Sequence, residues 1–317
     1  MSFPKMIIEH MTPRIPVMQG GMGIKVSLSG LAAAVANAGG IGTISGTGIS
    51  IEVLKEHIRK ARELTNGLGY IGVNVLFAMK DFAETIKAAM QEKVDFIISG
   101  AGFSRDMYAW GREYGVPVIS IVSSAKLARL AQRLGASAVV VEGFEAGGHL
   151  GTDRPLFDIL PEVVEAVNIP VIAAGGILHG EDIAKAIQMG AVGVQMGSRF
   201  VASHECDAHP AFKQMYLDCK EGGTVLVKTT VGLEGRAIKN HFTDMIFGDK
   251  KVKIDKCDSC LKHCSYRFCT RDSLMKSIDG DVENGLVFAG ARVHEIREIM
   301  SVQAIMDTLM KEYELAT

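Results

Sequence analysis

Short apolar runs alternate with longer amphipathic stretches over the first 200 residues. A short apolar run that ends in glycine is typical of a buried strand, and a stretch with a 3.6-residue period is typical of a helix. The pattern predicts strands at residues 16–19, 41–45, 70–76, 95–99, 116–122, 138–141, 170–174 and 193–196. It predicts helices at residues 27–38, 51–64, 81–92, 105–114, 124–134, 158–167 and 181–189, with Ser27 as the N-cap of the first.

Eight strands that alternate with helices, at a spacing of roughly 25 residues, favour a (β/α)8 TIM barrel. A doubly wound sheet is the alternative. No G-x-G-x-x-G motif follows the first strand, however, and glycine-rich loops follow many strands and not a single switch point. In a barrel these loops meet at the C-terminal face, where ligands bind.

The regular pattern ends after residue 202. Residues 203–290 are polar, less periodic and rich in cysteine, and residues 293–315 have the spacing of one or two helices. We therefore expect a barrel formed by residues 1–202 and 291–317. A small inserted lid segment, residues 203–290, would follow strand eight, and a C-terminal helix would pack back on the barrel.

Composition narrows the function classes. The chain has 317 residues, of which 48% are hydrophobic, and a net charge of −2, so a large core is expected and no basic stripe for nucleic acid is present. It contains no apolar run of about eighteen residues and no N-terminal signal pattern, which argues against a membrane protein. We expect a cytoplasmic protein with reduced cysteines.

The segment 142–151 carries the strongest chemical signal. It follows the predicted strand at 138–141 and places His149 beside Gly147 and Gly148. Glycines allow a backbone to approach a ligand closely, and a histidine can exchange a proton or hydrogen-bond a polar substrate. His149 is therefore the candidate catalytic residue.

Glycines also follow the seventh and eighth predicted strands. Gly175 and Gly176 end one of them, and Gly197 and Ser198 end the other. In TIM barrels these two positions often form a phosphate site from freed backbone N–H groups and a helix N-terminus. We expect an anionic group there.

Four cysteines lie within thirteen residues of the lid segment: Cys257, Cys260, Cys264 and Cys269. Their density suits a zinc site or an iron–sulfur cluster, although the spacing matches neither a standard zinc motif nor a ferredoxin motif. Free thiols are the alternative. Cys206 and Cys219 are expected to be unpaired and structural.

Five motifs together resemble the nitronate monooxygenase (2-nitropropane dioxygenase-like) flavoproteins and the related enoyl-ACP reductases II. The motifs are Gln19-Gly-Gly-Met22, Gly72-Val-Asn74, Glu142 with Ala146-Gly-Gly-His149, Ala173-Ala-Gly-Gly-Ile177 and Gln195-Met-Gly-Ser-Arg-Phe200. The resemblance covers residues 12–210 and, more weakly, the remainder. It does not separate the two branches.

The resemblance implies an FMN cofactor across the barrel mouth. It places Gly20, Gly21 and Met22 against the isoalloxazine, Asn74 at its polar edge, and Gly147 and Gly148 near the ring and the ribityl chain. Glu142 would bind ribityl hydroxyls, and Glu145 would point to solvent. Gly175, Gly176, Gly197 and Ser198 would hold the phosphate, with Gln195 nearby. His149 matches the active-site histidine of the family.

Three functions are compatible with the sequence. The first is oxidation of alkyl nitronates with O2 to a carbonyl compound and nitrite, which the motifs favour modestly. The second is NADH-dependent reduction of enoyl thioesters, for which the lysines between residues 250 and 262 could dock an acidic acyl-carrier protein. The third belongs to another class and rests on the cysteines: a flavin-binding redox sensor with low turnover, in which the four-cysteine segment responds to metal or oxidant. A homodimer is compatible with each of them.

Overall fold

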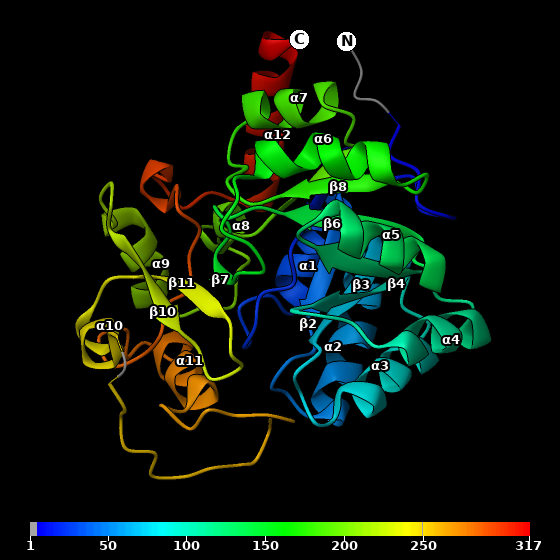
Figure 1. Cartoon of the computed structure of the whole chain (residues 1–317). Helices are drawn as coiled ribbons and strands as arrows, with labels where there is room; N and C mark the ends of the chain where they lie inside the picture. The colour runs from blue at the N-terminus through cyan, green and yellow to red at the C-terminus, as the bar shows by residue number, and fades with distance from the viewer. Residues whose placement is uncertain (1–4, 249) are drawn as a thin grey trace.

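A closed barrel of eight parallel strands forms the centre of the molecule in the computed structural model, which describes residues 5–248 and 250–317 (Figure 1). The barrel strands are β1 (Val17–Gln19), β2 (Ile41–Ser45), β3 (Tyr70–Leu76), β4 (Phe96–Gly100), β5 (Val118–Val122), β6 (Ala138–Glu142), β8 (Val171–Ala174) and β9 (Gly193–Met196). They are hydrogen-bonded in this order, and β9 pairs with β1 to close the ring. The predicted (β/α)8 barrel is confirmed.

Two apolar clusters show why these strands form a barrel. Met18, Ile41, Phe96 and Ile98 point inward and are fully buried, and residues of the N-terminal segment such as Met6 join the same interior cluster. The alternate positions along the strands face the helices and contribute to the larger outer cluster. Side chains alternate across a strand, so a run that is apolar at every position has to be covered on both faces.

Helices cover the outside of the barrel. They are α1 (Ser29–Asn37), α2 (Ile51–Leu64), α3 (Phe82–Gln91), α4 (Arg105–Tyr114), α5 (Ala125–Leu134), α6 (Leu156–Ala166) and α7 (Gly180–Gln188). The predicted cap of the first helix is wrong, because α1 begins two residues later, with Leu28 at its N-cap. The Ser27 hydroxyl instead accepts a hydrogen bond from the Met22 N–H at 2.9 Å, so it supports the loop after β1.

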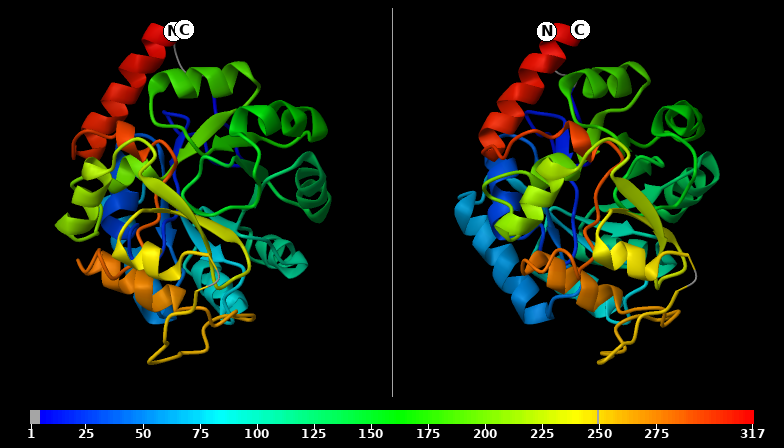
Figure 2. Two further views of the ribbon diagram at one scale, coloured as in Figure 1. Left: turned by 60° about the vertical axis from the view of Figure 1, so that its left-hand side comes forward. Right: turned by 90° about the vertical axis from the view of Figure 1, so that its left-hand side faces the viewer.

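The lid segment contains regular structure that the sequence pattern did not predict. After the short α8 (Ser198–Val201) it forms α9 (Pro210–Asp218), β10 (Thr224–Lys228), β11 (Glu234–Ile238), α10 (His241–Ile246) and α11 (Thr270–Ile278) (Figure 2). The sheet order is β10-β11-β7, and its third strand, β7 (Gly148–His149), comes from the barrel loop. The lid therefore holds the candidate catalytic histidine by backbone pairing.

The chain returns to the barrel after the lid segment. A short 3₁₀ turn, η1 (Val293–Glu295), precedes α12 (Val302–Ala316), which packs against α7 and α1. The first described residues, from Lys5 onward, and the end of α12 lie on the same side of the molecule (Figures 1 and 2). None of the helices in the described ranges combines the length and the apolar character that crossing a bilayer requires.

Candidate active site

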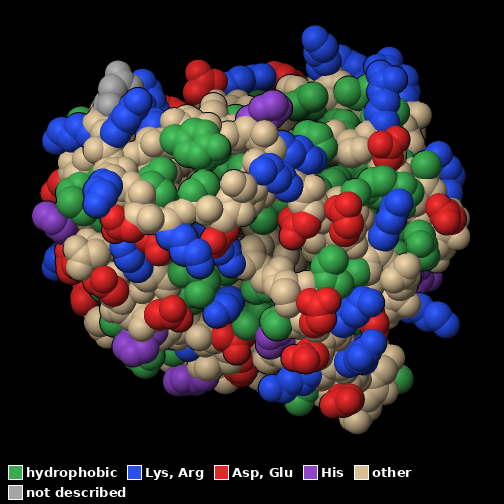
Figure 3. Space-filling view, turned by 90° about the horizontal axis from the view of Figure 1, so that it is seen from below, with side chains coloured by type: hydrophobic (Ala, Val, Ile, Leu, Met, Phe, Trp, Pro, Cys, Tyr) green, Lys and Arg blue, Asp and Glu red, His purple; other side chains and the backbone are tan. Residues whose placement is uncertain are grey.

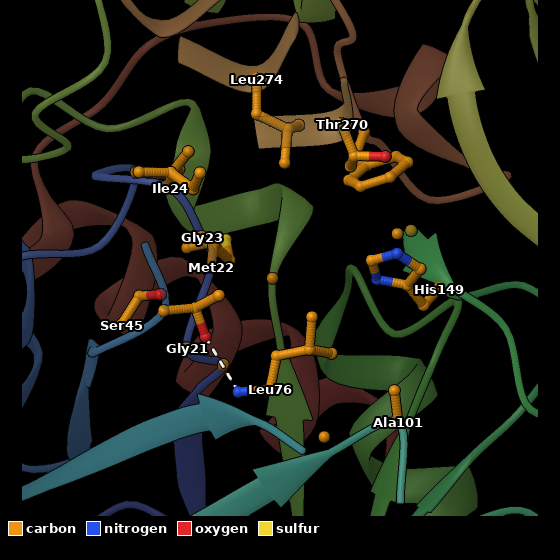
Figure 4. A pocket seen from close by; sticks show the side chains of 18 of the residues that line it. Gly21, Met22, Gly23, Ile24, Ser45, Leu76, Ala101, His149, Thr270 and Leu274 are labelled. Carbon is orange, nitrogen blue, oxygen red and sulfur yellow. Dashed lines mark hydrogen bonds between the residues drawn. The ribbon is translucent and has the colours of Figure 1, made fainter. Parts of the chain in front are cut away.

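A cavity of about 300 Å³ lies at the C-terminal ends of the barrel strands, between the barrel loops and the lid segment. It brings together every site residue expected from the sequence. These are Gly20, Gly21, Met22, Asn74, Glu142, Gly147, Gly148, His149, Gly175, Gly176, Gln195, Gly197, Ser198 and the four cysteines Cys257, Cys260, Cys264 and Cys269. Figure 4 shows His149 on one side of the cavity, across from Gly21 and Met22, with Thr270 and Leu274 of α11 closing it.

The loop after β1 lies directly on the end of β3. The Asn74 side-chain amide donates a hydrogen bond of 2.9 Å to the Gly21 carbonyl oxygen. A Cβ atom on Gly21 would lie 2.3 Å from the Asn74 Cβ atom, so only glycine permits this approach. The Asn74 Oδ1 atom is buried and has no hydrogen-bond partner among the described residues.

Burial keeps the His149 imidazole uncharged. The residue pairs with Gly235 of β11, and its ring packs against the edge of Phe288 with a centroid distance of 5.4 Å. Removal from water lowers the pKa of His149 to about 4, because the charged ring loses its hydration. Its Nε2 atom is buried without a hydrogen-bond partner in the described structure, so it is free to bond a ligand.

A second titratable group in the cavity is also uncharged near neutral pH. Glu142 ends β6, and burial raises the pKa of its carboxyl to about 8 because no cation offsets the desolvation. A protonated carboxyl can both donate and accept hydrogen bonds. Glu142 and His149 therefore leave this part of the cavity without a formal charge at pH 7.

The glycine loops after β8 and β9 line the cavity next to the loop that follows β6. Gly175 and Gly176 have φ angles of +97° and +73°, and a Cβ atom on Gly175 would lie 3.1 Å from the Gly143 carbonyl oxygen. Ser198 begins α8, and its hydroxyl accepts the Gly290 N–H at 2.9 Å. The Oε1 atom of Gln195 is buried without a partner among the described residues.

Sequence reasoning missed the segment that locks this part of the cavity. Arg292 donates a hydrogen bond of 2.7 Å to the Gly176 carbonyl oxygen and forms ion pairs with Asp182 and Glu295. A Cβ atom on Gly147 would lie 2.6 Å from the Ala289 carbonyl carbon, so the returning chain also lies against that loop. No local pattern could reveal the contacts of Arg292 with Gly176 and Asp182, or that of Gly147 with Ala289, because more than a hundred residues separate the partners in each pair.

Glu145 does not point freely to solvent, contrary to expectation. Its side chain is half-buried and lines the cavity, and its Oε2 atom accepts the Leu156 N–H at 3.0 Å. The Glu145 carbonyl oxygen also accepts the Ala291 N–H. This residue connects the loop of His149 to α6 and to the returning chain.

The chemistry of the cavity fits a flavin nucleotide. Asn74, His149 and Gln195 present buried polar atoms that have no partner in the described part of the chain. Burying such atoms costs free energy unless a ligand or water bonds them. The glycine loops leave room for a ring and place backbone groups where an anion can bind. The residues present therefore suit a planar, hydrogen-bonding cofactor with a phosphate tail.

The four cysteines line the outer wall of the cavity as free thiols. Cys257 is exposed, and Cys260, Cys264 and Cys269 are half-buried. Within the described ranges, no three His, Cys, Asp or Glu residues are arranged to hold a metal ion, so the predicted metal site is not confirmed. Cys206 and Cys219 are buried and free, as expected.

Comparisons with known proteins agree with this geometry. The family model for nitronate monooxygenase matches residues 5–92 and 80–312. A probable nitronate monooxygenase from Bacillus subtilis is 27% identical over 94% of this chain and 95% of its own length.

Two further relatives are more than 30% identical. A (3aS,4S,5R,7aS)-5-hydroxy-7a-methyl-1-oxo-octahydro-1H-indene-4-carboxyl-CoA dehydrogenase from Mycobacterium tuberculosis is 33% identical over 78% of this chain and 68% of its own length. The solved structure of FabK from Thermotoga maritima has a TM-score of 0.83 and 32% identity, covering 96% of this chain and 94% of that one. The family model and the cavity together establish that this chain belongs to the nitronate monooxygenase family and is a flavin-dependent oxidoreductase.

Proposed function

We propose that this enzyme binds FMN in the cavity and reduces the carbon–carbon double bond of an enoyl thioester. The observation that carries the proposal is that, among the described residues, no Lys or Arg without an ion pair lines the cavity that holds His149. Of the Lys and Arg residues in the described ranges, Arg271 and Arg292 line the cavity, and each forms an ion pair. A neutral thioester carries no charge that must be stripped of water when it enters such a site. An anionic nitronate would lose the hydration of its charge and gain no cation in return.

The chain would hold FMN through the loops already described. Gly20 and Gly21 would lie against the ring, Asn74 and Gln195 would bond its polar edge, and Gly175 and Ser198 would hold the phosphate. The neutral carboxyl of Glu142 would bond the ribityl hydroxyls as donor and acceptor. When bound, FMN supplies hydride chemistry, with NADH as the hydride source.

His149 would position and polarise the substrate. With a proton on Nε2, the neutral imidazole can donate a hydrogen bond to the thioester carbonyl oxygen and withdraw electron density from the double bond. The Phe288 edge and the β7–β11 pairing keep the ring in place. The lid segment excludes water from the reacting carbon atoms.

The relatives support an acyl thioester substrate. FabK is an enoyl-ACP reductase II, and the Mycobacterium tuberculosis relative acts on a carboxyl-CoA compound. The lysine-rich run from 250 to 262 is largely exposed beside the cavity, where it can attract an acidic acyl-carrier protein. Lys and Arg side chains lie among acidic ones on the face seen from below (Figure 3).

Oxidation of alkyl nitronates is the second candidate. It is favoured by the family model over nearly the whole chain and by the Bacillus subtilis relative, which matches at full length. In this reaction O2 would be the oxidant, and the Nε2 atom of His149 would hydrogen-bond the nitro group.

The two candidates are separated by anaerobic absorbance of the FMN-loaded protein. We expect NADH to bleach the flavin rapidly and a short enoyl-CoA to restore its colour, with little response to an alkyl nitronate. Reduction by the nitronate with no reaction toward NADH would overturn the reductase proposal and establish the second candidate.

A further inference from the structure

The reaction leaves unexplained the segment from residue 250 to residue 269, called here the cysteine strap. It has no helix or strand of its own and connects α10 to α11. It is attached to the barrel near its middle, where the Lys80 N–H donates to the Cys260 carbonyl oxygen and the Lys262 N–H donates to the Ala78 carbonyl oxygen. A loop of this length without regular structure is uncommon in a compact domain unless it has a function.

The structure brings the thiols of the strap to a single cavity, which all four line. Among the described residues, no three of these groups are already placed as ligands, so metal binding requires the strap to rearrange. Four thiols within a sequence span of thirteen residues are the type and number of ligands that a soft metal prefers.

Backbone N–H groups already point at two of the sulfur atoms. The Tyr266 N–H donates to the Cys264 Sγ atom and the Asp272 N–H to the Cys269 Sγ atom, each at 3.4 Å. In metal sites, hydrogen bonds from surrounding groups orient the ligand atoms. Ser259 and Tyr266 have φ angles of +50° and +53°, which are rare without glycine and mark tight turns beside Cys260 and Cys264.

The charge of the strap suits an anionic centre. From residue 250 to residue 271 the chain has seven Lys and Arg residues and only two acidic ones. Four thiolates around a divalent ion carry a net charge of about −2, which this excess of cations would offset. The opposite sign of charge would have argued against thiolate ligands.

We propose that Cys257, Cys260, Cys264 and Cys269 together bind one thiophilic metal centre, which fixes the cysteine strap over the cavity. The centre is either a zinc ion or an iron–sulfur cluster, since both take four thiolate ligands. The four thiols lose their protons on binding, so binding weakens as the pH falls. Binding requires the exposed Cys257 to move inward. This movement is possible because all but one of residues 253–257 are exposed and few contacts hold them in place.

The test is the metal content of the full-length chain, produced once with added zinc and once anaerobically with iron and sulfide. We expect about one zinc ion per chain, or iron with acid-labile sulfide and a visible absorption band. Cys260→Ser and Cys264→Ser should lower the content at least tenfold. Cys219→Ser, which changes a free thiol outside the cavity, is the matched control and should retain it.

Trypsin provides a second measurement that does not depend on turnover. The metal-bound chain should resist cleavage after Lys256 and Lys262, and removal of the metal with a chelator should expose both sites. Flavin binding by each variant shows that it is folded. Less than about a tenth of a metal equivalent in both preparations, or equal metal in Cys260→Ser and the control, would overturn the proposal. Neither result depends on which substrate the enzyme reduces.

Discussion

His149 illustrates how one residue acquires its chemistry from burial. Replacement by alanine removes the Nε2 group from the cavity, and we expect kcat/KM to fall by roughly 10²–10⁴-fold. The flavin affinity should change little, because the glycine loops remain. Steady-state assays with a fluorescence titration of FMN measure both quantities. Unchanged turnover in His149→Ala would remove this residue from the reaction.

The pH profile offers a separate test of the same residue. Burial lowers the pKa of His149 from 6.5 to about 4, so the imidazole stays neutral at any pH above about 5. We expect kcat/KM to show no inflection near pH 6.5. A clear loss of activity there that disappears in His149→Gln would mean that the ring is solvated and titrates normally.

Glu142 makes the stability of the flavin-free protein depend on pH. Burial raises its pKa from 4.5 to about 8. The unfolded chain therefore releases this proton at lower pH than the folded chain, and stability is lost as the pH rises from about 4.5 to 8. The slope from this group is at most about 1.4 kcal/mol per pH unit.

Urea unfolding of the flavin-free protein between pH 5 and pH 8 measures this effect. Glu142→Gln keeps the shape of the side chain but cannot ionise. We expect the variant to lose most of the slope and to be more stable than the wild type at pH 8. Identical slopes for the two proteins would show that Glu142 is hydrated.

At the scale of elements, the loop after β8 depends on a backbone conformation that only glycine adopts comfortably. Gly175→Ala adds strain at φ +97° and brings a Cβ atom 3.1 Å from the Gly143 carbonyl oxygen. We expect the Kd for FMN to rise at least tenfold, or about 1.4 kcal/mol. Gly222→Ala is the control, because φ is +69° there and the space is open. It should lose about 1 kcal/mol of stability without a change in flavin affinity.

The sequence predicted some elements well and missed others, depending on how strong their local pattern is. The predicted bounds of β2, β3, α2 and α4 agree with the structure, because strong periodicity ends at glycine, serine or another clear stop signal. The hairpin of β10 and β11 was missed because the side chains of β10 are mostly half-exposed, so no clean alternation of polar and apolar residues marks it. The Ser27 hydroxyl was misassigned because its partner, the backbone of Met22, belongs to the loop after β1 and not to the helix that follows.

At the scale of the whole molecule, Arg292 connects the returning chain to the barrel. It donates to the Gly176 carbonyl oxygen and pairs with Asp182 and Glu295 while about a third exposed. Arg292→Gln should weaken flavin binding and lower the free energy of unfolding by about 1–2 kcal/mol, a range that allows for solvent screening.

Arg154→Gln is the control for this variant. Arg154 forms a two-bond ion pair with Glu162 on the surface, outside the cavity, and we expect no measurable change in flavin affinity or thermal stability. Equal effects of the two substitutions on flavin binding would show that Arg292 does not support the cofactor loop.

The sequence by itself determined the barrel and the residues that surround its mouth. Each strand-and-glycine unit is a local pattern, and the closure of eight such units necessarily brings their loops to one face. Only the tertiary structure decided the state of the site. The pairing of β7 with the lid hairpin, the charge states of His149 and Glu142, and the clamp at Arg292 all depend on contacts between distant segments. Burial and long-range contact arise from the folded chain as a whole, so no local pattern encodes them.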